Sequence, residues 1–226
     1  MNLTPQHLWA SMGGPAKGVF FVLIAMLVAC VYVGIDRTIL FVRARGQSRS
    51  LAEAISAPLG SGNMEQALKV LRDEAYKLSY LGVILRAGLA EYAKEPSTYG
   101  LRALKRAVEI KGPVEVSNLR KGMNVLATTG STAPFVGLVG TIFGIINAFA
   151  IMATAGGGDL TAISGGIAEA LVSTAVGIAV AIAAIWIYNY FNAVLDDIQK
   201  DMTTAMQEIE DWAEKDLHQR GSQAAK

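Results

Sequence analysis

The residues that could do chemistry in the apolar part of this 226-residue chain are one carboxylate and a set of hydroxyls and glycines. Glu169 is the only acid in residues 122–195 apart from Asp159. A charged residue at the centre of a membrane helix costs about 2.5–3.5 kcal/mol on insertion scales, so such residues are rare there. Two roles are open for Glu169: part of an ion pathway, or an interfacial residue that snorkels or caps a neighbouring helix.

Small residues recur on one face of two apolar stretches. In the first stretch the positions i, i+4, i+7 and i+11 are Gly137, Thr141, Gly144 and Ala148. The second stretch carries Ser173, Thr174, Gly177 and Ala181. Such faces let helix backbones approach closely in lipid. Pro134 predicts a helix kink and removes one backbone donor, which nearby hydroxyls would partly offset. Tight packing alone also explains small faces, so they do not by themselves indicate a pore.

Composition excludes most other site chemistries. The net charge of +1 argues against a nucleic-acid partner, and 17% charged residues lie below the roughly 25% of a soluble domain. The single Cys30 excludes an intrachain disulfide, and His7 and His218 form no ligand pair. We find no nucleophile–base pair, phosphate loop or metal cluster, so we expect neither an enzyme nor a bound cofactor.

Three uncharged runs predict the elements that must position these residues. They cover residues 18–35, 122–158 and 170–195. One crossing of the hydrocarbon core needs about 20 apolar helical residues. The middle run would be about 56 Å long as one helix, so we interpret it as a single crossing that continues as helix outside the bilayer. The chain is therefore predicted to be an all-α membrane protein with three transmembrane helices and long helical cytoplasmic extensions.

The charges between these runs predict the orientation. Residues 43–121 hold fourteen Lys and Arg against eight Asp and Glu, whereas residues 154–164 hold one acid and no base. The positive-inside rule then places the former in the cytoplasm and the latter, with the N-terminus, in the periplasm. The predicted segments are a periplasmic 1–17, a span at 18–42, a cytoplasmic 43–127, a span at 128–153, a periplasmic loop 154–164, a span at 165–192 and a cytoplasmic 193–226.

Apolar stripes predict helices in the cytoplasmic segments. Asn63 with Gln66 resembles a capping box, and a heptad stripe continues from it to Tyr92 as one helix. A second helix is expected at 98–110, ending before Pro113, and the tail repeats a stripe over 195–212. These stripes fit either a helical hairpin packed within one chain or contacts between the subunits of a ring.

Several of these motifs together resemble the TolQ/ExbB/MotA proton-channel family. Residues 132–149, TAPFVGLVGTIFGIINAF, resemble the family's second-span signature. The third-span signature is similar to GIAEAL at 166–171, TAVG at 174–177 and YNYF at 188–191, and Asp36-Arg37 resembles the family's acidic-Arg pair. One departure is Ala183, where the family usually has a proline, and this puts any kink at that position in doubt.

The resemblance implies a specific function. Such proteins are ring-forming motor subunits, pentamers that enclose a dimer of an ExbD/TolR-like partner, whose single membrane helix carries a proton-binding Asp. Thr141 and Thr174 match the family's pore-lining threonines, and Glu169 matches its span-three glutamate. The implied function is a proton-channel stator of a bacterial inner membrane that drives TonB-type transport, Tol-type envelope maintenance or gliding motility. The alternative is a non-conducting membrane scaffold that assembles a partner complex.

Overall fold

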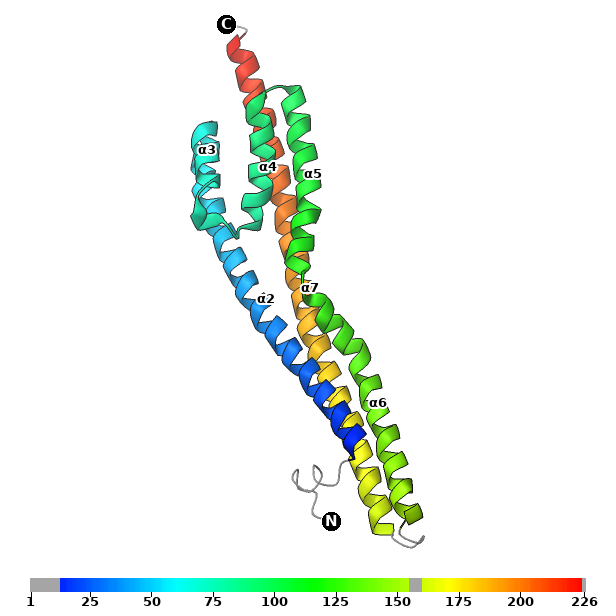
Figure 1. Ribbon diagram of the computed structural model, residues 1–226. Coiled ribbons are helices and arrows are strands. Elements are labelled where there is room, and N and C mark those ends of the chain that lie inside the picture. The colour runs from blue at the N-terminus through cyan, green and yellow to red at the C-terminus, as the bar shows by residue number, and fades with distance from the viewer. Residues whose placement is uncertain (1–12, 155–159, 225–226) are drawn as a thin grey trace. The chain divides into compact units, whose positions relative to one another are not determined.

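The described part of the chain is built from helices. A computed structural model describes residues 13–154 and 160–224, and no strand occurs among them. Figure 1 shows the elements, which are α2 (Gly14–Gly60), α3 (Met64–Leu71), a 3₁₀ turn η1 (Glu74–Tyr76), α4 (Tyr80–Lys94), α5 (Thr98–Arg120), α6 (Met123–Thr154) and α7 (Leu160–Ala224). The all-α prediction is confirmed.

Three of the described helices are long and apolar enough to cross a membrane. They are α2, the Met123–Ala153 part of α6 and the Ser164–Ser222 part of α7, with mean hydropathies of 2.7, 2.2 and 2.4 in their most apolar windows. The prediction of three transmembrane helices is confirmed at this level of length and composition. Asp159 and the loop glycines around it lie outside the described residues.

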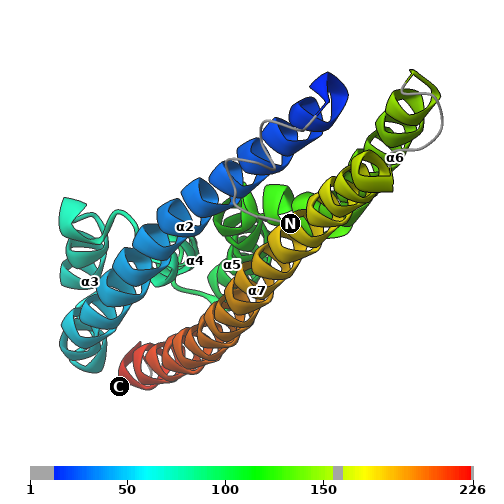
Figure 2. The same ribbon diagram turned by 90° about the horizontal axis from the view of Figure 1, so that it is seen from below.

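The chain divides into two compact units, which are described separately below. The first, here the membrane unit, comprises Met1–Ile35 and Gly122–Tyr190. The second, here the polar unit, comprises Asp36–Lys121 and Phe191–Lys226. Two helices, α2 and α7, contribute to both units, and Figure 2 shows each of them as a continuous ribbon.

In the polar unit, the expected helix from Asn63 to Tyr92 is interrupted. Asn63 does cap α3, since its side chain accepts a hydrogen bond from the Gln66 N–H at 3.0 Å. The helix stops at Leu71, and the next two elements start on new caps: Asp73 accepts from Ala75 N–H, and Ser79 accepts from Gly82 N–H. The prediction of one continuous helix was wrong because these short polar side chains bond to the backbone and favour new helix starts over continuation.

The second correction concerns α5, which runs past Pro113 to Arg120 instead of ending near Ile110. Proline disfavours a helical residue before it because its ring clashes with that residue's backbone N–H and Cβ. Here the preceding residue is Gly112, which has no Cβ. The helix therefore loses one hydrogen bond at Pro113 but continues for two more turns.

The part of α7 that the charges predict to be cytoplasmic packs inside its own chain. Leu195, Ile198, Met202 and Ile209 of the tail stripe are buried in the polar unit. On α4, Leu85, Leu89 and Tyr92 are buried, whereas Leu78 of the expected stripe is 38% exposed because it precedes the helix. Packing within one chain is confirmed for the tail stripe.

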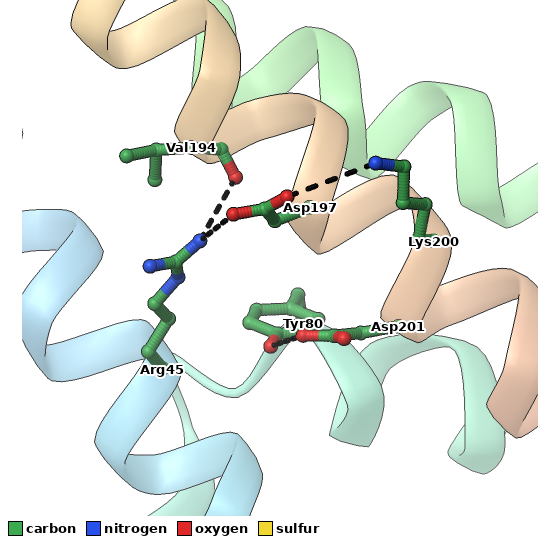
Figure 3. Close-up of polar contacts among 6 residues, drawn as sticks. All are labelled: Arg45, Tyr80, Val194, Asp197, Lys200 and Asp201. Atoms are coloured by element: carbon green, nitrogen blue, oxygen red, sulfur yellow. Dashed lines mark hydrogen bonds and ion pairs between the residues drawn. The ribbon is translucent and has the colours of Figure 1, made fainter.

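Directional polar contacts fix α7 against two other helices of the polar unit. Figure 3 shows Arg45 of α2 donating to Asp197 at 3.1 Å and to the Val194 carbonyl at 3.4 Å. The Tyr80 hydroxyl of α4 donates to Asp201 at 2.7 Å. The two acceptors, Asp197 and Asp201, lie four residues apart and so on one face of α7. Their bonds therefore set the rotation of that helix about its own axis.

A second set of polar contacts lies further along α7. The Tyr92 hydroxyl donates to Asp216 at 2.8 Å and to the Ala213 carbonyl at 3.1 Å. The Trp212 indole, which packs edge-on to the Tyr92 ring, donates to the Leu59 carbonyl near the end of α2. Burial, with the bonded aspartates as a smaller cause, raises the pKa of Tyr80 and of Tyr92. Both phenols therefore stay protonated over the physiological range.

Candidate functional site

The centre of the membrane unit is a direct backbone contact between α6 and α7. A Cβ atom placed on Gly177 would lie 2.7 Å from the Ala133 carbonyl oxygen and 3.0 Å from the Gly137 Cα. One placed on Gly137 would lie 2.9 Å from the Ser173 carbonyl oxygen. Real Cβ atoms do not come this close to backbone, so glycine is required at both positions. This contact joins two residues that the sequence places on separate small faces.

The same antiparallel register continues toward the Thr154 end of α6. A Cβ on Gly140 would meet the Ser173 side chain at 2.8 Å, and one on Gly144 would meet the Ala170 side chain at 3.0 Å. One turn further, a Cβ on Gly166 would lie 2.5 Å from that of Ala148. The structure therefore brings Gly137, Gly144, Ala148, Ser173 and Gly177 into one interface.

Helix α2 covers one side of this pair through larger side chains. Val19 and Leu23 form a buried cluster with Ala133, Val180 and Ala181. Ala181 thus lies at the junction of three helices, which is a different environment from the glycine contact. The three apolar helices form one packed body in the membrane unit, and α6 and α7 provide its closest approach.

The two threonines singled out in the sequence lie at the same level of this helix pair. Thr141 follows Gly140, which meets Ser173, and Ser173 precedes Thr174. The half-buried Thr141 hydroxyl donates to the Leu138 carbonyl at 2.7 Å. Thr174 Oγ1 is the one buried side-chain oxygen or nitrogen in the described residues that has no hydrogen-bond partner. An unpaired buried hydroxyl costs about 1–3 kcal/mol.

Pro134 lies inside α6, which is helical on both sides of it. Proline cannot donate to the carbonyl four residues earlier, that of Gly130. The nearby hydroxyls of Ser131 and Thr132 donate instead to the Thr128 carbonyl, at 3.0 and 2.7 Å. These two bonds therefore do not replace the hydrogen bond that the Gly130 carbonyl loses at Pro134. A hydroxyl in a helix reaches the carbonyl three or four residues before it, and Ser131 and Thr132 follow Gly130 by only one and two residues.

Glu169 lies within α7, two residues after Ile167 and just before the buried Ala170. Its side chain is outside the part of the molecule that the structure describes. Both roles considered for it therefore remain predictions.

Sequence reasoning gave no role to one polar residue of the membrane unit, Asn147. A Cβ on Gly13, just before α2, would lie 3.3 Å from the Asn147 side-chain amide. The sequence could have pointed to this residue, because Asn147 places a polar amide within a 37-residue uncharged run. The tyrosine–aspartate contacts of the polar unit were also not foreseen, since Tyr92 was assigned to an apolar stripe without a partner for its hydroxyl.

Within the described ranges, no group of three or more His, Cys, Asp or Glu side chains converges on one point. What the site offers is a small set of hydroxyls beside a glycine contact between two apolar helices. These features define a helical multi-pass membrane protein with hydroxyl groups placed inside its membrane unit.

Comparison with known proteins identifies the family. Residues 77–204 match the MotA/TolQ/ExbB proton channel family. The chain is 30% identical over 209 residues to the biopolymer transport protein ExbB of Xanthomonas campestris pv. campestris strain B100, covering 86% of this chain and 79% of the relative. The chain therefore belongs to the MotA/TolQ/ExbB proton channel family, and its three apolar helices fit the TolQ/ExbB-like branch.

Two further relatives represent both names within that branch. The ExbB protein of Pseudomonas putida is 32% identical over 184 residues, covering 80% of this chain and 55% of that protein. The Tol-Pal system protein TolQ of Pseudomonas aeruginosa is 39% identical over 116 residues, covering 49% of this chain and 50% of that protein. The chain is similar both to ExbB proteins and to a TolQ protein, so its membership in the family does not select one transport process.

Proposed function

We propose that this chain is the ring-forming subunit of a proton-driven motor in a bacterial inner membrane. Its N-terminus and residues 154–164 would face the periplasm, and residues 43–127 and 193–226 the cytoplasm. Support comes from the family and from fourteen basic residues against eight acidic ones in residues 43–121. Five copies would surround two copies of an ExbD/TolR-like protein with a single membrane helix.

The observation that carries the proposal is the buried Thr174 hydroxyl without a partner. A hydroxyl both donates and accepts hydrogen bonds, so it can bind either a protonated or an ionised carboxyl group and also water. Thr141, at the same level of the helix pair, can break its bond to the Leu138 carbonyl and offer a second hydroxyl. Together they would solvate a proton carrier in an otherwise apolar pore.

The carboxylate that carries the proton is assigned to the partner. Glu169 is the only acid in residues 122–195 besides the loop residue Asp159, so this chain cannot build a relay of carboxylates by itself. A membrane Asp on the partner helix would be protonated on one side and released on the other. Glu169 would act near the periplasmic end of this pathway.

Ring symmetry gives the proton flow a mechanical outcome. Five equivalent subunits cannot match two partner helices symmetrically, so protonation of each Asp in turn favours relative rotation. The partner would transmit this work to TonB-type transport, Tol-type envelope maintenance or gliding motility.

The test is proton flux into liposomes that contain the chain with its partner. Thr174→Val and Thr141→Val remove the hydroxyls with little change in shape, and each should lower flux at least tenfold while the complex still assembles. Thr174→Ser keeps the hydroxyl and should retain flux. Thr204→Val, which changes an exposed threonine of the polar unit, is the matched control. Full flux in both membrane variants would exclude this pore assignment.

The second candidate is a non-conducting scaffold, and the glycine contact favours it because close packing alone explains Gly137 and Gly177. Glu169→Gln separates the two functions. Loss of flux with an intact complex supports an ionic role, whereas loss of the complex supports a structural one.

A further inference from the structure

Two long helices of the chain, α5 and α6, are separated by only two residues. Helix α5 ends at Arg120 and α6 begins at Met123, with Lys121 and Gly122 between them. Gly122 has a φ of +81°, in the left-handed region that favours glycine. The residues on either side of the break are buried, since Leu119 is 4% exposed and Met123 0%. The chain therefore breaks its helix between buried residues and does so at one glycine.

The carbonyl of Leu119 would be bonded differently if the two helices were continuous. In a continuous α-helix this oxygen would accept the N–H four residues later, that of Met123. The described residues contain no such backbone bond, and the oxygen accepts instead from Nη1 of Arg37 on α2, at 3.4 Å. Without Arg37 the break would leave this acceptor unpaired, whereas a continuous helix would pair it.

The side chain of Arg37 is oriented for this bond. Its Nε and Nη2 both donate to Asp36, at 3.0 and 2.6 Å, which leaves Nη1 for the Leu119 carbonyl. The arginine side chain is only 17% exposed, and Asp36 offsets its charge. A cation beside the last carbonyls of a helix also interacts favourably with the helix dipole. Arg37 therefore has both the geometry and the charge to stabilise the end of α5.

We propose that α5 and α6 form a two-state element, in which Arg37 and the left-handed Gly122 together hold the break and loss of either favours one continuous helix. In the continuous form Gly122 would adopt helical φ and ψ, and the Met123 N–H would bind the Leu119 carbonyl. Because Arg37 belongs to α2, a displacement of α2 that withdraws its guanidinium would change how α6 begins. This device goes beyond the proposed function, since it requires neither a ring nor proton flux.

Hydrogen exchange of the full-length chain in lipid nanodiscs, read at single-residue resolution, tests this element. In Arg37→Gln the exchange of the Met123 amide should slow roughly tenfold or more, because a continuous helix gives this N–H an acceptor. Gly122→Ala should slow it as well, since its Cβ meets nothing within 4 Å and alanine disfavours the left-handed region. Gly122→Asn tolerates that region and should leave the exchange unchanged.

Two controls make the result readable. The amides of α4 in the same measurement show whether each variant is folded, and Arg43→Gln changes an exposed arginine of α2 that should not affect Met123. Slower exchange at Met123 in Arg37→Gln and in Gly122→Ala, but not in Arg43→Gln, supports the element. Unchanged or faster exchange in either of the first two, when folded, overturns it. If Arg37→Gln does not fold, Gly122→Ala alone decides by the same criterion.

Discussion

The two units of this protein achieve close packing by opposite means. In the membrane unit, α6 and α7 meet where side chains are absent, with backbone facing backbone at Gly137 and Gly177. In the polar unit, large side chains fill the core and tyrosine hydroxyls reach specific aspartates on α7. The difference follows from the solvent. Lipid gives no hydrophobic drive for helix association, so close contact must supply it, whereas water drives the burial of large apolar groups.

The largest effect is expected from filling the glycine contact. Gly177→Val places its Cβ 2.7 Å from the Ala133 carbonyl oxygen, where backbone cannot move away locally. Overpacking costs about 1–3 kcal/mol in ordinary cores, and a clash with backbone lies at or above the top of that range. We expect little folded protein in the membrane fraction, measured by detergent extraction and size-exclusion chromatography. Gly18→Ala, whose Cβ meets nothing within 4 Å, should extract normally.

A smaller effect is expected from removing one hydroxyl in the polar unit. Tyr92→Phe leaves the Ala213 carbonyl and Asp216 without the phenol donor, although Arg220 still pairs with Asp216 at 2.7 Å. The expected loss is about 1–3 kcal/mol of unfolding free energy. The fluorescence of Trp212 in a Trp9→Phe, Trp186→Phe background reports it, and the 69% exposed Tyr99→Phe is the control. Equal melting of both variants would contradict a stabilising Tyr92 bond.

Alkaline pH should destabilise the polar unit. Burial, reinforced by hydrogen bonds to Asp201 and Asp216, raises the pKa of Tyr80 and Tyr92 in the folded chain. Above about pH 10 the unfolded chain loses these protons while the folded chain keeps them. Stability of the polar unit is therefore complete below pH 10 and falls as the pH rises beyond it. Replacing both tyrosines with Phe should flatten the alkaline limb of unfolding followed by Trp212 fluorescence.

The smallest effect is expected at Lys105. It pairs with Glu210 at 2.9 Å, and its pKa is raised mainly by that hydrogen bond. The lysine side chain is 41% exposed, so its removal in Lys105→Ala should cost only about 0.2–1 kcal/mol and less at high salt. Chemical denaturation at two salt concentrations measures it. A salt-independent loss above this range would mean that packing of the lysine stem matters more than its charge.

The sequence predicted those features that depend on composition over long stretches. Three uncharged runs were enough to predict three helices that are long and apolar enough to cross a membrane, because one crossing needs about 20 apolar residues. The spacing of Gly137 and Gly177 identified two small faces, but only the structure shows that these two glycines meet each other. The periodicity of small residues describes each helix separately. It does not say which residues of one helix lie opposite which residues of another.

Local competition limited the prediction in the polar unit. The heptad stripe from Asn63 to Tyr92 suggested one helix, but Asp73 and Ser79 start new elements within it. Pro113 suggested a helix end, but α5 continues through it from Gly112 to Arg120. In both cases one or two residues decided the local structure. The unpaired state of Thr174 Oγ1 depends on three-dimensional surroundings, so no sequence pattern reports it.

The participation of α7 in both units has a consequence for biosynthesis. Leu23, made early, packs against Val180 and Ala181, and Tyr92 bonds to Asp216, so each unit is completed by residues of the last described helix. Neither unit can reach its native packing while α7 is still in the ribosome. The packing of both units therefore waits on the synthesis of one helix.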